Sequence, residues 1–226
     1  MFKVSARLLA VLGTALLACS VQAATLQSHV YDQDGKPLAD AVVTLKGPAN
    51  GQPRLKATMD QKGQEYVPHV LAVHSGSEVS FPNLDNIRHQ VYSFSPTKRF
   101  ELRLYEGTPS APVLFDKAGL VVLGCNIHDW MLGYIYVTDD PWFAVTDAQG
   151  AVRFEGLSAA SYEVTVWHPQ TLDMQPFAAG SVTVPAQGLS RDFSLSVQPA
   201  RTDAPSAPAP SAFGNAFKKA AGETAQ

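Results

Sequence analysis

The chain has 226 residues, of which 46% are hydrophobic and 16% are charged, and its formal net charge at pH 7 is −3. A hydrophobic fraction of this size is typical of globular proteins and excludes a chain that is disordered throughout. The weakly acidic balance argues against a basic nucleic-acid-binding protein, so no nucleic-acid partner is expected. The length allows one large domain or two small ones.

Residues 1–23 have the pattern of a secretory signal peptide. Lys3 and Arg7 supply a positive start, a short apolar run ends at Cys19, and a small-residue cleavage signal ends at Ala23. The apolar run is too short to span a bilayer comfortably, and no later segment is apolar enough to span one. The pattern therefore predicts a protein exported to the periplasm without a membrane span.

The two cysteines have different fates in this interpretation. The sequence Leu-Leu-Ala-Cys that ends at Cys19 resembles a lipoprotein cleavage box, which would leave a lipid anchor on Cys19. Leu17 fits that box poorly, so ordinary cleavage near Ala23 is preferred. Cys125 is then the sole cysteine of the mature chain. A lone thiol in an oxidising compartment has no disulfide partner, so either a metal ion or deep burial must account for it.

The mature chain has the pattern of an all-β protein. Short apolar-rich stretches recur, each bounded by Gly, Pro, Asn or Asp, and none has a long period of 3.6 residues. This pattern predicts two β-sandwiches. The expected strands include 41–45, 70–73, 78–81, 90–94, 120–123, 134–137 and 162–166.

Two stretches far apart in the chain share a strand–turn–strand pattern. Residues 30–45 turn at Gly35, and residues 145–167 turn at Gly150. These pieces resemble the two halves of a carboxypeptidase regulatory-like β-sandwich domain, which acts as a spacer or as a binding module for glycans or proteins. We therefore expect that residues 24–56 and 141–198 form one sandwich, split by an inserted domain at 57–140. In the alternative, tandem order, residues 25–50 supply the first strands of the central domain.

The C-terminal segment 199–226 differs from the rest of the chain. It is rich in Pro and Ala and has few large apolar residues. Such a segment cannot bury enough surface to offset its ordering entropy, so a disordered tail is predicted.

A candidate metal site lies in the centre of the chain. Cys125, His128 and Met131 follow one another between two strand-like runs, so a compact loop could bring their donor atoms together. A thiolate and two imidazoles in a trigonal arrangement, with a weak axial thioether, suit copper. Structural zinc sites use four strong ligands, and a c-type haem site needs a second cysteine. The second imidazole is expected from His89, which begins a strand after a turn-rich link.

At these residues the sequence resembles the cupredoxin family. The spacing Cys-x-x-His-x-x-Met is similar to the short ligand loop of amicyanin-like members, and Tyr66-Val-Pro68, the strand that leads to Asn83, and then His89 are similar to the upstream half. The resemblance implies a Greek-key sandwich over 57–140 and one copper ion that cycles between Cu(I) and Cu(II). It assigns His89, Cys125 and His128 to the trigonal plane and Met131 to the axial position.

One residue departs from the family pattern. Cupredoxins often place Asn directly after the first histidine ligand, where it ties the two ligand loops together. This chain has Gln90 there. We expect Asn83 or Asn126 to make the tie instead, or the tie to be looser.

The resemblance implies a periplasmic one-electron carrier and not an enzyme, because four filled ligand positions leave no place for a substrate. More narrowly, the sequence looks like bacterial proteins labelled methylamine utilization proteins. That label implies a redox partner protein, either a dehydrogenase or a c-type cytochrome. The alternatives are a periplasmic copper carrier or sensor, and a structural or binding protein with a non-redox metal site. The remaining histidines, His29, His69, His74 and His168, are interpreted as ordinary surface or core residues.

Overall fold

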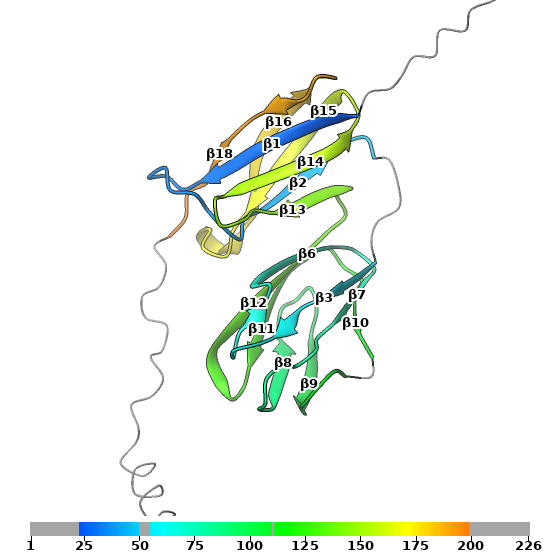
Figure 1. Cartoon of the computed structure of the whole chain (residues 1–226), viewed down its shortest axis with the longest axis vertical. Coiled ribbons are helices and arrows are strands. Elements are labelled where there is room, and N and C mark those ends of the chain that lie inside the picture. Colours follow the sequence, from blue (N-terminus) through cyan, green and yellow to red (C-terminus); the bar gives the residue numbers. More distant parts are fainter. Residues whose placement is uncertain (1–22, 50–54, 110, 199–226) are drawn as a thin grey trace, which may run out of the picture.

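The computed structural model describes residues 23–49, 55–109 and 111–198. The predicted signal peptide at 1–23, apart from Ala23, and the predicted disordered tail at 199–226 therefore lie outside the described residues. Two β-sandwiches lie one above the other in Figure 1. The only helical element in the described ranges is a 3-10 turn at Leu172–Met174. The prediction of an all-β protein is confirmed, and each of the expected strands overlaps an observed one, although the strand expected at 134–137 begins six residues earlier, at His128.

The first sandwich is built from the two flanks of the described chain. One sheet centres on β1, which pairs with β14, β17 and β18, and the other has the order β13-β2-β15-β16. Along β1 alternate residues are buried, as expected of a strand with one face on a core. The strands are β1 (Ala24–Tyr31), β2 (Val42–Lys46), β13 (Trp142–Val145), β14 (Ala151–Leu157), β15 (Ala160–Trp167), β16 (Phe177–Val184), β17 (Leu189–Ser190) and β18 (Phe193–Ser194).

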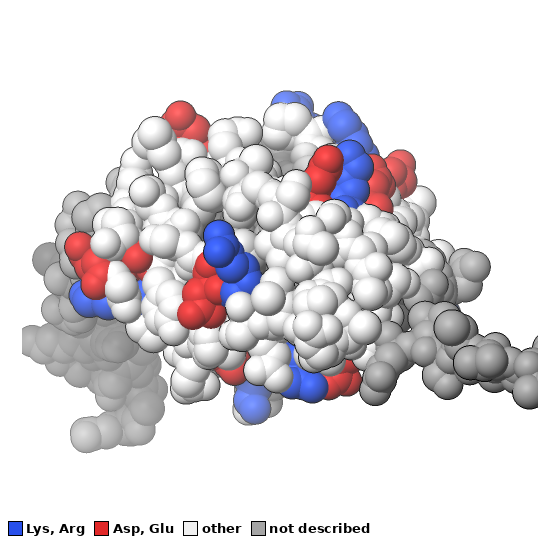
Figure 2. All heavy atoms as spheres, turned by 90° about the horizontal axis from the view of Figure 1, so that it is seen from above, with Lys and Arg blue, Asp and Glu red and all other residues white. Residues whose placement is uncertain are grey.

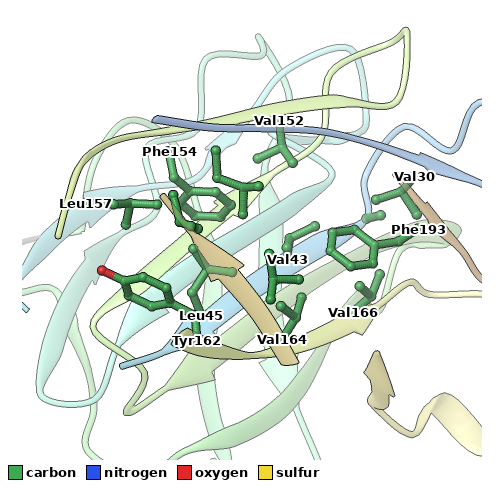
Figure 3. Close-up of a cluster of buried hydrophobic side chains, with 14 of the residues drawn as sticks. Val30, Val43, Leu45, Val152, Phe154, Leu157, Tyr162, Val164, Val166 and Phe193 are labelled. Atoms are coloured by element: carbon green, nitrogen blue, oxygen red, sulfur yellow. The ribbon is translucent and has the colours of Figure 1, made fainter. Parts of the chain in front are cut away.

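The core of the first sandwich joins residues from both flanks. Leu45 of β2 pairs with Val164 of β15, and Val43 pairs with Val166. Figure 3 shows these side chains together with Phe154 and other apolar residues of the flanks. The pairing of β2 with β15 is the one that the insertion hypothesis requires and that a simple tandem order does not. We therefore propose the insertion as the domain organisation.

The second sandwich contains the strands between these flanks. Its larger sheet has the order β6-β12-β11-β8-β9 and its smaller sheet the order β10-β7-β3, so the chain passes from the larger sheet at β9 to the smaller one at β10 and returns to the larger one at β11. The strands are β3 (Lys56–Thr58), β4 (Asp60–Gln61), β5 (Tyr66–Val67), β6 (Val70–His74), β7 (Ser77–Ser80), β8 (His89–Ser93), β9 (Phe100–Tyr105), β10 (Val113–Phe115), β11 (Gly119–Cys125) and β12 (His128–Thr138). Because β3 starts at Lys56 and pairs with β7, we propose that the inserted domain begins at or before Lys56.

The second half of the long strand β12, residues 133–138, is buried on both faces, because a core lies on each side of it. Ile135 and Val137 belong to the core of the second sandwich, whereas Tyr134 and Tyr136 point the other way. The rings of Tyr134 and Tyr136 lie 5.9 and 5.5 Å from the ring of Trp167 on β15. Trp167 is fully buried. The two sandwiches therefore share an apolar interface.

Polar contacts border this interface. The Thr44 hydroxyl donates to Asp140 at 2.5 Å, and the His69 ring contacts the Asp40 carboxylate at 2.9 Å. The surface charges are sparse and mixed in sign. On the face seen in Figure 2, basic and acidic groups lie beside one another and no broad region has one sign. Within the described ranges, no helix has the length and apolar character needed to cross a membrane.

The interface between the sandwiches is expected to stabilise the fold. Replacing Trp167 by Ala deletes a buried aromatic side chain that touches both sandwiches, so we expect a loss of about 3–5 kcal/mol in the free energy of unfolding. Urea unfolding monitored by circular dichroism measures it. Phe94→Ala is the control, because this ring is 75% exposed and its loss should cost only about 0.5 kcal/mol. Equal losses in the two variants would contradict a stabilising interface.

Candidate metal centre

Three neighbouring strands carry the three strong donors of the predicted site. Cys125 ends β11, His128 begins β12 and His89 begins β8. In the sheet β11 lies between β12 and β8, so the two histidines come from the strands on either side of the cysteine. Cys125 pairs directly with His128 across the short link, with a register shift at Gly124. The hairpin itself thus brings two of the donors together.

The donor atoms converge on one point. Cys125 Sγ lies 3.8 Å from His89 Nδ1 and 3.7 Å from His128 Nδ1, and one ligand atom from each of the three residues lies within 4.8 Å of the other two. A metal with bonds of about 2.0 Å to nitrogen and about 2.3 Å to sulfur, meeting at about 120°, separates N from S by about 3.7 Å. The observed distances match this trigonal separation. The arrangement can therefore hold one metal ion between a sulfur and two nitrogens.

The burial of the donors is graded. His89 is fully buried and Cys125 is 2% exposed, whereas His128 is partly exposed. Burial, and then repulsion from His89, lowers the pKa of His128, so its ring is neutral near neutral pH. A neutral imidazole is the form that binds a metal. The Trp130 ring lies 5.2 Å from the His128 ring, on the side of the site that reaches the surface.

Met131 follows His128 on β12 and is 1% exposed. It belongs to the same buried apolar cluster as Cys125. The structure thus brings His89, Cys125 and His128 together and places Met131 in the core beside them. The assignment of Met131 as the axial ligand stays a prediction.

The other histidines are held by groups outside this cluster. His29 contacts Asp192, His69 contacts Asp40, and the partners of His74 and His168 are the carbonyls of Ser75 and Ala39.

Tyr66 ties the two ligand-bearing strands together. Its hydroxyl donates to the Gly124 carbonyl at 2.9 Å and lies 3.4 Å from the Gln90 carbonyl. These carbonyls belong to the residues next to Cys125 and His89. Burial, and then the nearby Cys125, raises the pKa of Tyr66, so the hydroxyl keeps its proton and remains a donor.

The ring of Tyr66 reaches this position because Gly133 has no side chain. A Cβ at Gly133 would lie 2.8 Å from atoms of the Tyr66 ring. The expectation that Asn83 or Asn126 makes the tie is replaced by this contact. Asn83 instead closes its own loop, through Nδ2 to the carbonyls of Ile87 and Tyr105. The sequence contains the aromatic residue and the glycine, but nothing in it shows that they meet.

Asp85 is a second residue that sequence reasoning missed. Its carboxylate lies 2.8 Å from His89 Nε2 and accepts the backbone N–H groups of Gly63 and Gln64. Burial alone would raise the pKa of Asp85, but the hydrogen bonds from Gln64, Gly63 and His89 together lower it. The available signal was an acidic residue four positions before the histidine, a spacing that is common by chance.

Comparisons with known proteins gave only structural matches. No family model and no curated protein matches the chain. A purple cupredoxin from Nitrosopumilus maritimus is 21% identical, with a TM-score of 0.33, over 36% of this chain and 99% of that one. An oxidised amicyanin mutant is 17% identical, with a TM-score of 0.34, over 42% of this chain and 98% of that one. A copper-containing nitrite reductase from Thermus scotoductus is 24% identical, with a TM-score of 0.35, over 42% of this chain and 25% of that one.

The role of the Tyr66 hydroxyl in tying the ligand strands can be tested in the metal-free protein. We expect Tyr66→Phe to lower the free energy of unfolding by about 1–3 kcal/mol, because a buried carbonyl loses its donor. We also expect Cys125 to react faster with a thiol reagent such as Ellman's reagent, since the ligand strands are no longer tied. Unfolding in urea and the rate of thiol modification are the two measurements.

Tyr162→Phe is the matched control for this experiment. The Tyr162 hydroxyl donates to the Ser158 carbonyl at 3.0 Å in the first sandwich, and the ring is also buried. The control should be destabilised without a change in the reactivity of Cys125 in the folded protein. An equal rise in reactivity in both variants would mean that global unfolding, and not the tie, exposes the thiol.

Proposed function

We propose that the chain is a blue (type 1) copper protein that transfers single electrons in the periplasm. The convergence of one thiolate and two imidazole nitrogens, with S–N distances of 3.7 and 3.8 Å, carries this proposal. Of the first-row metals, copper is the one that this soft, three-coordinate donor set with a weak thioether suits best. A bound copper ion would supply the one-electron couple between Cu(I) and Cu(II).

The protein's own residues have distinct roles in this proposal. Cys125 would supply the strong covalent donor to the copper ion, and His89 and His128 would supply the two imidazole nitrogens. Met131 would be a weak thioether donor that tunes the potential. The hydroxyl of Tyr66 holds the two ligand strands at a fixed separation. A ligand set that cannot move keeps its geometry when the metal changes its charge, which favours fast electron transfer.

The electron route to a partner leads through His128. This ring is the partly exposed donor, and the apolar side chains of Ile127 and Trp130 beside it are 49% and 37% exposed. Exposed apolar side chains beside the donor are suited to brief contact with another redox protein, because the cores of protein interfaces are depleted of charged residues, and the exposed Asp129 lies at the edge of this patch. The partner we propose is a dehydrogenase or a c-type cytochrome. The lone thiol of Cys125 and the signal-peptide pattern support the periplasm as the location.

Copper loading tests the proposal directly. Purified mature protein mixed with Cu(II) should show an intense thiolate-to-copper absorption band and a reversible one-electron potential. Cys125→Ser should abolish the band, because it removes the sulfur donor. Absence of the band in the wild type would overturn the copper proposal. A band that is lost with its copper on reduction would favour the metal-carrier alternative.

The axial role of Met131 requires a separate variant. Met131→Leu should keep the band and shift the reduction potential, because only the weak donor is lost. Met59→Leu is the matched control, since Met59 is fully buried in the same apolar cluster and is not a predicted ligand. Visible spectroscopy and voltammetry give both readouts. Loss of the band in Met131→Leu, or an equal shift in both variants, would contradict the assignment.

A further inference from the structure

The ring of His89 is held by a carboxylate on the side away from Cys125. Nε2 lies 2.8 Å from Asp85 Oδ2, and Nδ1 faces Cys125 Sγ at 3.8 Å. An ionised carboxylate has no proton to donate, so the proton in this contact is on Nε2. Nδ1 is then the nitrogen with the free electron pair. The contact with Asp85 thus selects the tautomer that can bind a metal between the ring and the thiolate.

The carboxylate of Asp85 is itself fixed in position. Oδ1 accepts the N–H of Gly63 at 2.7 Å, and Oδ2 accepts the N–H of Gln64 at 2.9 Å. The Asp85 N–H donates to the side chain of Asn83 at 3.0 Å. Charge-assisted hydrogen bonds of this kind are stronger than neutral ones. Asp85 therefore cannot swing away from His89 without losing several bonds.

The backbone conformation of the turn between Lys62 and Glu65 directs two N–H groups towards the Asp85 carboxylate. Gly63 and Gln64 both have positive φ angles, 67° and 62°, between the paired ends Lys62 and Glu65. Successive residues in such a turn can direct neighbouring N–H groups towards one anion. The left-handed conformation is unfavourable for a residue with a side chain, here Gln64. The hydrogen bonds that the N–H groups of Gly63 and Gln64 donate to the Asp85 carboxylate offset that cost.

We propose that Asp85 is a positioning residue that orients His89 as an Nδ1 ligand and lowers the reduction potential of the bound copper. A carboxylate that accepts the second N–H of a ligating imidazole makes the ring a stronger donor. Its negative charge also favours the more highly charged Cu(II) over Cu(I). The inference rests on the proposed copper function and assigns this tuning to one residue.

Asp85→Asn tests the tuning with little change in shape. Loss of an outer partner of this kind costs 10–100-fold in metal affinity. We expect the affinity for Cu(II) to fall about tenfold more than that for Cu(I), and a tenfold difference raises a one-electron potential by about 59 mV. Competition titrations with both copper ions and voltammetry measure these quantities. An unchanged potential in copper-loaded Asp85→Asn would overturn the tuning role.

Glu106→Gln is the control for charge alone. Glu106 pairs at 3.2 Å with Arg88, the neighbour of His89, and its carboxylate is exposed. The substitution removes the same unit charge near the site without touching the His89 ring. We expect little change in potential, because exposed charges are screened. A shift equal to that of Asp85→Asn would assign the effect to net charge and overturn the role of the hydrogen bond.

The tautomer of His89 in the copper-free wild-type protein is a further readout. It depends neither on copper binding nor on whether Asp85→Asn folds. Nitrogen NMR of the wild-type His89 ring, at mildly alkaline pH, should show the proton on Nε2. Folded Asp85→Asn should show a mixture of tautomers. A proton on Nδ1 in the wild type would overturn the positioning role. If the wild type binds no copper, the proposed function fails, and the tautomer still decides whether Asp85 orients His89.

Discussion

The strand β12 is the constraint on which the arrangement of this protein depends. It begins at His128, pairs with β11 through the hairpin that ends at Cys125, and runs parallel to β6. One of its faces builds the core of the second sandwich, and the other packs on Trp167 of the first. A one-residue slip of β12 would exchange these faces and separate His128 from Cys125. The packing of both sandwiches thus fixes the register that the candidate metal site needs.

The short hairpin of β4 and β5 supports the site from outside the ligand strands. The N–H groups in its turn hold the Asp85 carboxylate, and Tyr66 in β5 bridges the backbones beside His89 and Cys125. The Gln90 side chain instead contacts Glu101 away from the ligands. Two hydrogen-bonded contacts from one hairpin therefore take the place of an Asn beside the first histidine. A site supported in this way is preorganised before any metal binds.

The interface between the sandwiches bears on how such a site would work. Tyr134 and Tyr136 on β12 and Trp167 on β15 are large, rigid groups in ring contact. An apolar interface of this kind limits the relative motion of the two sandwiches more than a polar one does. In the proposed insertion, both ends of the second sandwich enter the first. We infer that the two sandwiches stay fixed relative to each other when a redox partner contacts the proposed metal site at His128.

Much of the fold and of the donor set could be predicted from the sequence. Alternating apolar residues between turn residues predict strands such as β2 and β15, because the strand period of two is a local property. The spacing of Cys125, His128 and Met131 on a hairpin is also local, and His89 is set apart by its place at the start of a strand. The partners Tyr66, Gly133 and Asp85 could not be predicted, because nothing in their own segments shows what they contact.

The local structure of each segment follows from the amino-acid sequence alone: strands, tight turns and a loop with a thiol and an imidazole. The position of β8 beside β11, which brings the Nδ1 atom of His89 to 3.8 Å from the Cys125 sulfur, emerges only when the chain packs in three dimensions. The same packing decides that β2 pairs with β15 and that the Gly63–Gln64 turn meets Asp85. The physical reason is that these contacts join segments distant in the chain, and their energy depends on how both sandwiches pack.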